Sequence, residues 1–190
     1  MGYNWFTADM HFGHENIIAA CDRPFINAEA MHAVLIRKWN ERVHPADTVY
    51  HLGDFCFKGG SEGGTTKAQT WEKQLNGKII HIEGNHDENN GTASLITNAL
   101  MRFGGHIVLA QHMPPTMPQE IPEFVDFVIC GHVHGAWDYK IMEDPRNEKI
   151  PIPMINVGVD VWDYFPVRLD ELLAYYDKLV KQVNYPRLKS

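Results

Sequence analysis

Aspartate, asparagine and histidine residues occur in five short blocks, and each block directly follows an apolar run. Imidazole nitrogens, carboxylate oxygens and an amide oxygen suit Mn²⁺, Fe, Zn²⁺, Co or Ni better than Ca²⁺. The chemistry expected of such a set is metal binding. The blocks are Asp9-Met10-His11, Gly53-Asp54, Gly84-Asn85-His86-Asp87, Gln111-His112 and Gly131-His132-Val133-His134.

The spacing within two blocks fits the geometry of a metal site. In an extended segment, side chains two residues apart point to one face, with Cα atoms ~6–7 Å apart. Asp9 and His11 can therefore approach one ion from one side, whereas His132 and His134 can serve two ions ~3.5–4 Å apart. Glycine, asparagine and aspartate also favour turns. Turn chemistry explains any one block, but it does not explain five blocks at matching strand ends.

The elements that must position these blocks alternate between strand-like and helical patterns. This alternation predicts an α/β layered core, in which ligands gather beyond the carboxyl ends of the strands. Asn27 is expected to cap a helix in which Met31, Val34, Leu35 and Trp39 follow at helical spacing. Strands are predicted at 3–8, 47–52, 78–83, 106–111, 126–130 and 152–161, further helices at 65–76, 93–103 and 170–180, a loop at 58–64 and an exposed turn at 144–148.

Length and composition restrict the class of protein. The 190 residues fit one domain spanning residues 1–190, and a net charge of −7 argues against nonspecific binding to nucleic acid or anionic lipid. Three cysteines without a C-x-x-C pair predict a reducing, cytoplasmic location. Apolar runs are too short for a membrane span, and the first residues do not read as a secretory signal.

The five blocks, in this order, resemble the calcineurin-like metallophosphoesterase superfamily, whose blocks read D-x-H, G-D-x-x-D, G-N-H-[DE], H and G-H-x-H. Asn156-Val157-Gly158 resembles its late strand-end block, so the resemblance covers most of the chain. The stretches TADMHFGHENII, CDRPF and NVGVDVW are similar to a small bacterial and phage group of predicted phosphoesterases. The resemblance implies a β-sandwich flanked by helices in four layers, α/β-β/α.

The resemblance also implies roles for the block residues, with two divalent transition-metal ions, Mn²⁺ foremost, as cofactors. One ion would be held by Asp9, His11 and His134, and the other by Asn85, His112 and His132. Asp54 would bridge both ions, and His86 would act as an acid or transition-state stabiliser without being a ligand. One position departs from the family, because Phe57 stands where the second acid of G-D-x-x-D supports the catalytic histidine.

Charge arithmetic predicts the reaction. Two divalent ions, two aspartates and a bridging hydroxide leave a site charge of about +1, which attracts a phosphate group despite the acidic chain. The expected reaction is in-line attack by that hydroxide on phosphorus, with His86 protonating the leaving oxygen. A small phosphate ester is the expected substrate, with a diester favoured over a monoester, and extended nucleic acid is not expected as a partner.

Two further residues have both a functional and a structural interpretation. His14 is a candidate phosphate contact, against a role in starting a helix. Arg23 could bind phosphate bidentately, although a surface salt bridge is slightly favoured. For the whole protein the alternatives are a metal-dependent nuclease, which the lack of a Lys/Arg cluster disfavours, and a silent scaffold like the family's retromer subunit, which a complete ligand set disfavours.

Overall fold

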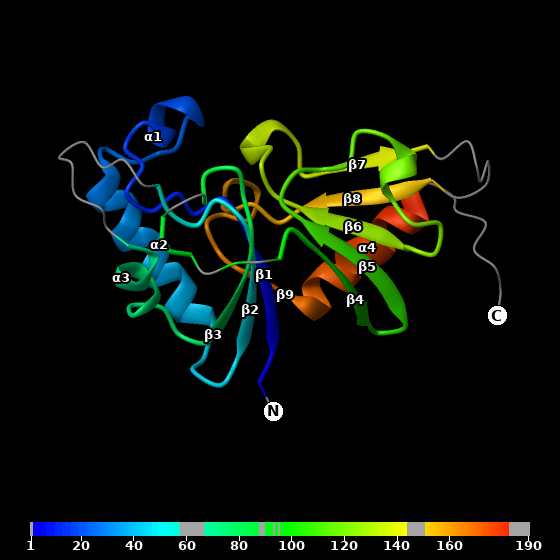
Figure 1. Ribbon diagram of the computed structural model, residues 1–190, viewed down its shortest axis with the longest axis horizontal. Coiled ribbons are helices and arrows are strands. Elements are labelled where there is room, and N and C mark those ends of the chain that lie inside the picture. The colour runs from blue at the N-terminus through cyan, green and yellow to red at the C-terminus, as the bar shows by residue number, and fades with distance from the viewer. Residues whose placement is uncertain are drawn as a thin grey trace.

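Two β-sheets form the centre of the computed structural model, which describes residues 2–57, 67–87, 90–92, 94, 96–143 and 151–182 (Figure 1). The first sheet has the order β3-β2-β1-β9, with β1, β2 and β3 parallel and β9 antiparallel. Its strands are β1 (Asn4–Thr7), β2 (Thr48–Leu52), β3 (Lys78–Ile82) and β9 (Val167–Arg168).

The second sheet has the order β4-β5-β6-β8-β7. Its three central strands are parallel, and the edge strands β4 and β7 are antiparallel to their neighbours. Its strands are β4 (Asn98–Phe103), β5 (His106–Gln111), β6 (Phe127–Cys130), β7 (Tyr139–Met142) and β8 (Ile152–Asn156).

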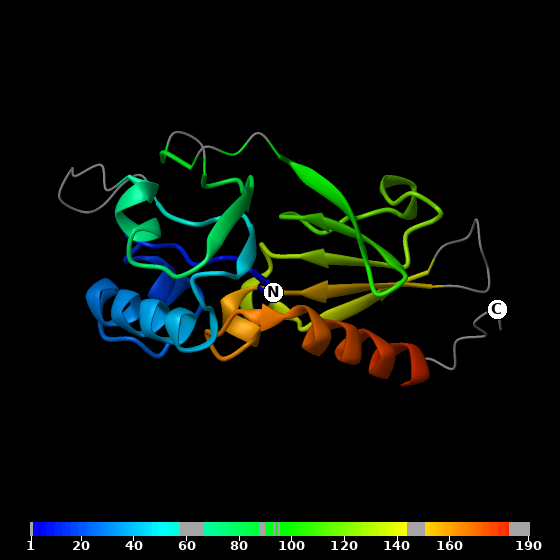
Figure 2. The same cartoon turned by 90° about the horizontal axis from the view of Figure 1, so that it is seen from below.

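Helices α2 (Ala28–Arg42) and α3 (Ala68–Glu72) cover the outer face of the first sheet, where the short α1 (Ile17–Ala20) also packs (Figure 2). As predicted, the side chain of Asn27 caps α2 by accepting a hydrogen bond from the Ala30 N–H. The buried face of α2 consists of Met31, Leu35 and Trp39. Burial of each such side chain contributes about 1.5–3 kcal/mol, which holds the helix against the sheet.

Helix α4 (Leu169–Gln182) joins the core that lies between the sheets. Its buried residues Leu172, Tyr176 and Leu179 share one cluster with Phe6 of the first sheet and Phe127 of the second. The other face of the second sheet is covered by Ile121 and Val125, which follow the 3₁₀ helix η1 (Pro118–Glu120). The predicted α/β class, with two sheets flanked by helices, is confirmed.

The predicted helix at 93–103 is wrong, because residues 98–103 form strand β4. Gly104 and Gly105, with φ of 55° and 87°, form a two-residue turn that pairs Phe103 with His106. Positive φ at both central residues is typical of a tight hairpin. Ala99, Met101 and Phe103 alternate toward the core between the sheets, so the apolar period is two.

Smaller differences concern the ends of elements. Helix α3 ends at Glu72, short of the predicted end at residue 76, and the predicted strand at 152–161 ends at Asn156 before the 3₁₀ helix η3 (Val159–Val161). The predicted loop at 58–64 and turn at 144–148 lie outside the described residues. No helix in the described part of the chain combines the length and apolar character needed to cross a bilayer.

The carboxyl ends of β1 and β2 meet those of the second sheet at the junction of the two sheets (Figure 1). An isolated bridge pairs Ala8 after β1 with Gly158 after β8, and the Asp9 N–H donates to the carbonyl of Gly53. A Cβ atom on Gly131 would lie 2.5 Å from Ala8 Cβ. Only glycine therefore allows the two sheets to approach this closely.

Candidate metal centre

The backbone is strained at five predicted metal ligands. A non-glycine residue with positive φ is uncommon, and such residues cluster at functional sites. The values are 60° at Asp9, 51° at His11, 57° at Asp54, 71° at His132 and 46° at His134. These residues lie in the segments that follow strands β1, β2 and β6.

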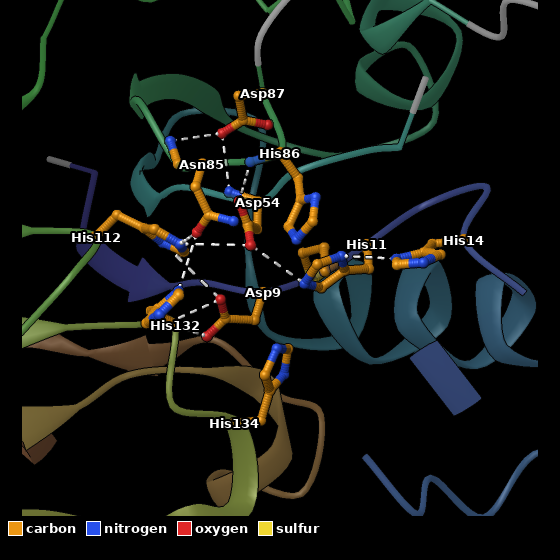
Figure 3. A network of polar contacts seen from close by, with 12 residues as sticks. Asp9, His11, His14, Asp54, Asn85, His86, Asp87, His112, His132 and His134 are labelled. Carbon is orange, nitrogen blue, oxygen red and sulfur yellow. Dashed lines mark hydrogen bonds and ion pairs between the residues drawn. The ribbon is translucent and has the colours of Figure 1, made fainter. Parts of the chain in front are cut away.

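These side chains gather in two groups that lie next to each other (Figure 3). The first group is Asp9, His11 and His134, and the second is Asp54, His112 and His132. Within each group, one nitrogen or oxygen atom of every residue lies within 4.8 Å of the others. Such distances allow each group to surround one ion.

Asn85 belongs with the second group. Its Oδ1 atom lies 2.9 Å from His112 Nε2 and 2.9 Å from His132 Nδ1. An amide oxygen between two imidazoles is a suitable additional ligand for a divalent ion.

Asp54 lies between the two groups. Its Oδ2 atom is 3.4 Å from Nε2 of His11 and 3.4 Å from Nε2 of His112. Its Oδ1 atom accepts a hydrogen bond of 2.9 Å from the His86 N–H. One carboxylate oxygen thus faces a histidine of each group.

The donor atoms fit a transition-metal ion. His11 Nε2 is buried and has no hydrogen-bond partner among the described residues, although it faces Asp54. A buried polar atom without a partner is costly, and a bound cation would satisfy it. Burial raises the pKa of the Cys56 thiol to about 12 and also raises that of Cys130, so both thiols are protonated at neutral pH without a metal.

For two of the histidines, a hydrogen bond determines which ring nitrogen can bind a metal. Nδ1 of His112 donates to the carbonyl of Leu52 at 2.8 Å, and Nδ1 of His134 donates to Asp160 Oδ2 at 2.9 Å. Both bonds leave Nε2 as the lone-pair nitrogen. Partners of this kind orient ligating histidines and raise their basicity.

Arg23 completes the support of His134. Its guanidinium binds Asp160 through Nε at 2.8 Å and Nη2 at 2.9 Å, and Nη2 also donates to the Asp9 carbonyl at 2.7 Å. The Arg23 side chain is 0% exposed, so it is committed to these partners and unavailable for phosphate. The hypothesis that Arg23 binds phosphate bidentately is therefore wrong. The slightly favoured alternative, a salt bridge, is present, but it is buried and does not lie on the surface.

The two aspartates have opposite pKa shifts. Burial raises the pKa of Asp9 to about 6. Burial by itself would also raise the pKa of Asp54, but the hydrogen bond and positive charge of His112, with the charge of His11, outweigh it and lower the pKa. Asp54 is therefore an anion at neutral pH, ready to face two cations.

The pKa values of the histidines are also shifted in opposite directions. Burial lowers the pKa of His11 well below its usual range and lowers that of His132. Burial alone would lower the pKa of His134 too, but the hydrogen bond to Asp160 outweighs it and raises the pKa to about 10. Without a metal, each group thus pairs carboxylates with imidazoles, and a bound cation would replace the proton on His134.

His86 lies at the exposed side of the site, outside both groups (Figure 3). Its ring centroid is 5.4 Å from that of His11 and 6.0 Å from those of His14 and Phe57. At the position of the family's second acid, the ring of Phe57 therefore lies near His86, and no carboxylate is present at that position.

Asp87 does not replace the missing acid. Its carboxylate accepts hydrogen bonds from the N–H groups of Asp54, Phe55 and Gly84, at 2.8, 2.9 and 2.9 Å. In Figure 3 it points away from His86, toward the backbone of the Asp54 loop. Asp87 thus holds the loop that carries Asp54. The sequence analysis treated the block Gly84-Asn85-His86-Asp87 as a source of metal ligands and did not predict this role.

His14 stacks on Phe57 with ring centroids 4.1 Å apart and planes 10° apart. Its Nδ1 atom lies 3.2 Å from Nδ1 of His11. His14 therefore supports a predicted metal ligand, and its half-buried ring borders the site.

Asn156, at the end of β8, holds the loop that carries His134. Its Nδ2 group donates to the carbonyls of His134 at 2.7 Å and Trp137 at 2.9 Å, and its Oδ1 accepts from the Gly158 N–H. The sequence analysis identified Asn156-Val157-Gly158 as a strand-end block. It did not predict Asp160 as the partner of His134, because no local pattern indicates that contact.

Comparisons with known proteins agree with this geometry. A family model described as the calcineurin-like phosphoesterase superfamily domain matches residues 8–158. The chain is 33% identical to the uncharacterized protein MJ1445 of Methanocaldococcus jannaschii, over 95% of this chain and 96% of that protein. It is 29% identical to the Gene 66 protein of Mycobacterium phage L5, over 85% of this chain and 88% of the phage protein. The structure of AQ665 from Aquifex aeolicus, a protein of unknown function, has a TM-score of 0.66 at 24% identity and covers 92% of this chain and 100% of its own, which shows a shared fold.

Proposed function

The chain belongs to the calcineurin-like phosphoesterase superfamily, and on that premise we propose that it hydrolyses a phosphate ester with two divalent metal ions. The observation that carries the proposal is the position of Asp54, one oxygen of which lies 3.4 Å from a histidine nitrogen of each group. A carboxylate shared in this way is what a pair of adjacent ions needs as a bridge.

Each ion would have a defined set of ligands. One would be held by Asp9, His11, His134 and Asp54, and the other by Asp54, Asn85, His112 and His132. Two such ions lower the pKa of a bound water and neutralise phosphoryl oxygens. The all-nitrogen and oxygen donor set favours a transition metal, and Mn²⁺ is the ion we propose.

His86 would donate a proton to the leaving oxygen. Its N–H group is anchored on Asp54, which fixes the backbone, while its ring lies exposed beside the first group. A proton donor within reach of the leaving group contributes roughly 10²–10⁴-fold to the rate.

A phosphodiester is the proposed substrate class. A groove of about 440 Å³ is lined in part by Asn85 and His112 of the second group, and the lining of another groove, of about 450 Å³, includes Val133, which follows His132 in the chain. A diester has two substituents to place. Asn85 and His86 are exposed, so the site is reachable by a small ester.

The test uses metal-free protein reloaded with Mn²⁺, supplied with bis-p-nitrophenyl phosphate and p-nitrophenyl phosphate. We expect metal-dependent hydrolysis with the diester preferred, and His86→Ala should lower kcat by roughly 10²–10⁴-fold without changing the metal content. The control is His44→Ala, since His44 is an exposed histidine outside both groups. Absence of hydrolysis by protein that holds two ions would contradict the proposal, and full activity of His86→Ala would contradict the role of His86.

A further inference from the structure

A polar groove of about 440 Å³ opens beside the second group of metal ligands. Small-molecule sites have volumes of roughly 300–1,000 Å³, so this groove is large enough for a substituent of the ester. The residues lining it come from the ends of β3 and β5 and the start of β4. Besides Asn85 and His112, its side chains are Glu83, Thr97, Asn98, Gln111 and Met113.

The lining offers both hydrogen-bond donors and acceptors, because the side chains of Thr97, Asn98 and Gln111 can do both. Glu83 offers only carboxylate oxygens, which accept. The amide N–H of Gln111 already donates to the Met113 carbonyl at 2.6 Å, which leaves its Oε1 as an acceptor. A ligand that fits such a lining both donates and accepts hydrogen bonds, and a neutral hydroxyl group does both.

The charge of the lining disfavours a second anion. Among the described residues around this groove there is no lysine or arginine, and Glu83 is acidic. A substituent with a second phosphate would meet an unfavourable charge with no cation to balance it.

A second groove, of about 450 Å³, differs in chemistry. Its lining is largely apolar and includes Pro114, Val133, Trp137, Met142 and Met154. Val133, one of its lining residues, stands between His132 and His134 in the chain. The two grooves therefore differ in chemistry, and only the polar groove shares residues with the second group of metal ligands.

We propose that the polar groove is the subsite for an uncharged, hydroxyl-bearing substituent of the ester, such as a sugar. The inference rests on the proposed function, because the phosphoryl group would lie at the metal ligands. Asn85 and His112 belong both to the groove wall and to the second group. A phosphate held there directs one of its ester oxygens into the groove.

The experiment measures binding, separately from turnover. Ribose 5-phosphate, phenyl phosphate and inorganic phosphate are each titrated into Mn²⁺-loaded protein by calorimetry. We expect ribose 5-phosphate to bind at least about tenfold more tightly than inorganic phosphate, since one or two hydrogen bonds to a charged or amide acceptor supply that factor. Glu83→Gln and Gln111→Ala should each remove most of this advantage, whereas Met142→Ala, in the other groove, should preserve it.

The other outcomes overturn the inference. Tighter binding of phenyl phosphate that is lost in Met142→Ala would assign the substituent to the apolar groove. Equal affinity for ribose 5-phosphate and inorganic phosphate, or binding of none of the three, would show that the polar groove holds no sugar. Hydrolysis of bis-p-nitrophenyl phosphate by the wild-type protein is recorded in parallel, so failure of the phosphoesterase proposal is seen independently of failure of the groove.

Discussion

The two groups of metal ligands are supported in different ways. In the first group, His134 depends on Asp160, and Asp160 depends on the buried Arg23, which is 137 positions away in the chain. In the second group, His112, which follows β5 of the second sheet, is oriented by the carbonyl of Leu52, at the end of strand β2 of the first sheet. The first group therefore depends on a buried ion pair, and the second depends on a backbone carbonyl of the first sheet.

This difference has an energetic consequence. Removing one partner of a buried ion pair leaves the other uncompensated and costs about 3–5 kcal/mol. A backbone carbonyl cannot be removed by substitution, so the second group tolerates changes that the first does not. We expect the first group to be sensitive to residues that touch no metal.

The largest effect is expected at the residue that both groups share. Asp54→Asn removes the charge that faces His11 and His112, so both ions should bind more weakly and hydrolysis of bis-p-nitrophenyl phosphate should fall by more than about 100-fold. Metal content after dialysis, measured by mass spectrometry, checks this. Retention of both ions with near-normal activity would show that Asp54 is no bridge.

Asp160→Asn tests the support of the first group alone. We expect the affinity for one ion to fall roughly 10–100-fold while the second ion is retained, because His134 loses its anionic partner. Calorimetric titration of the metal resolves the two binding events. Glu171→Gln is the matched control, since Glu171 pairs with Arg42 outside both groups. Equal weakening of both ions would mean that the groups are not separately supported.

His14→Phe tests a smaller element of the same group. The aromatic ring can still stack on Phe57, but the nitrogen that faces His11 Nδ1 is lost. The affinity for the first ion should fall by about tenfold, at the low end of effects from partners of metal ligands. His14→Gln, which keeps a polar group near His11, should recover part of it; unchanged metal affinity in His14→Phe would remove His14 from the support of the site.

The smallest effect on function is expected at Asp47, a buried aspartate at the start of β2, at the opposite end from the ligands. Burial alone would raise its pKa, but hydrogen bonds from the His44 and Tyr3 N–H groups and from Trp5 Nε1 outweigh it and lower the pKa.

Because the folded-state pKa of Asp47 lies below the unfolded value of about 3.9, its stabilisation is present above that value and is lost as pH falls through the folded-state pKa. Asp47→Asn should lower the free energy of unfolding by about 1–3 kcal/mol at pH 7 and by less near pH 3, with metal binding unchanged. Urea unfolding at both pH values measures this. A loss that grows toward low pH would reverse the assigned sign.

Local patterns predicted much of the fold. Strands β1, β2, β3, β5 and β6 lie where apolar runs predicted them, because each is a short, largely apolar run that is closely followed by glycine or polar residues. The hairpin of β4 and β5 was predicted as a helix followed by a strand, although Gly104-Gly105 between two apolar runs is a turn signal. Residues 98–103 contain leucine, methionine and alanine, which favour helices, and packing against the core between the sheets overrides that preference.

The sequence by itself determined which side chains meet at the site, because their chemistry and their position at strand ends are local properties of the chain. Only the tertiary structure decided how they are supported. Arg23 lies behind Asp9, Asp160 reaches His134, and Phe57 packs on His14 because the sheets and loops dock in one particular way. Such contacts join residues far apart in the chain, and no local pattern of residue types encodes them.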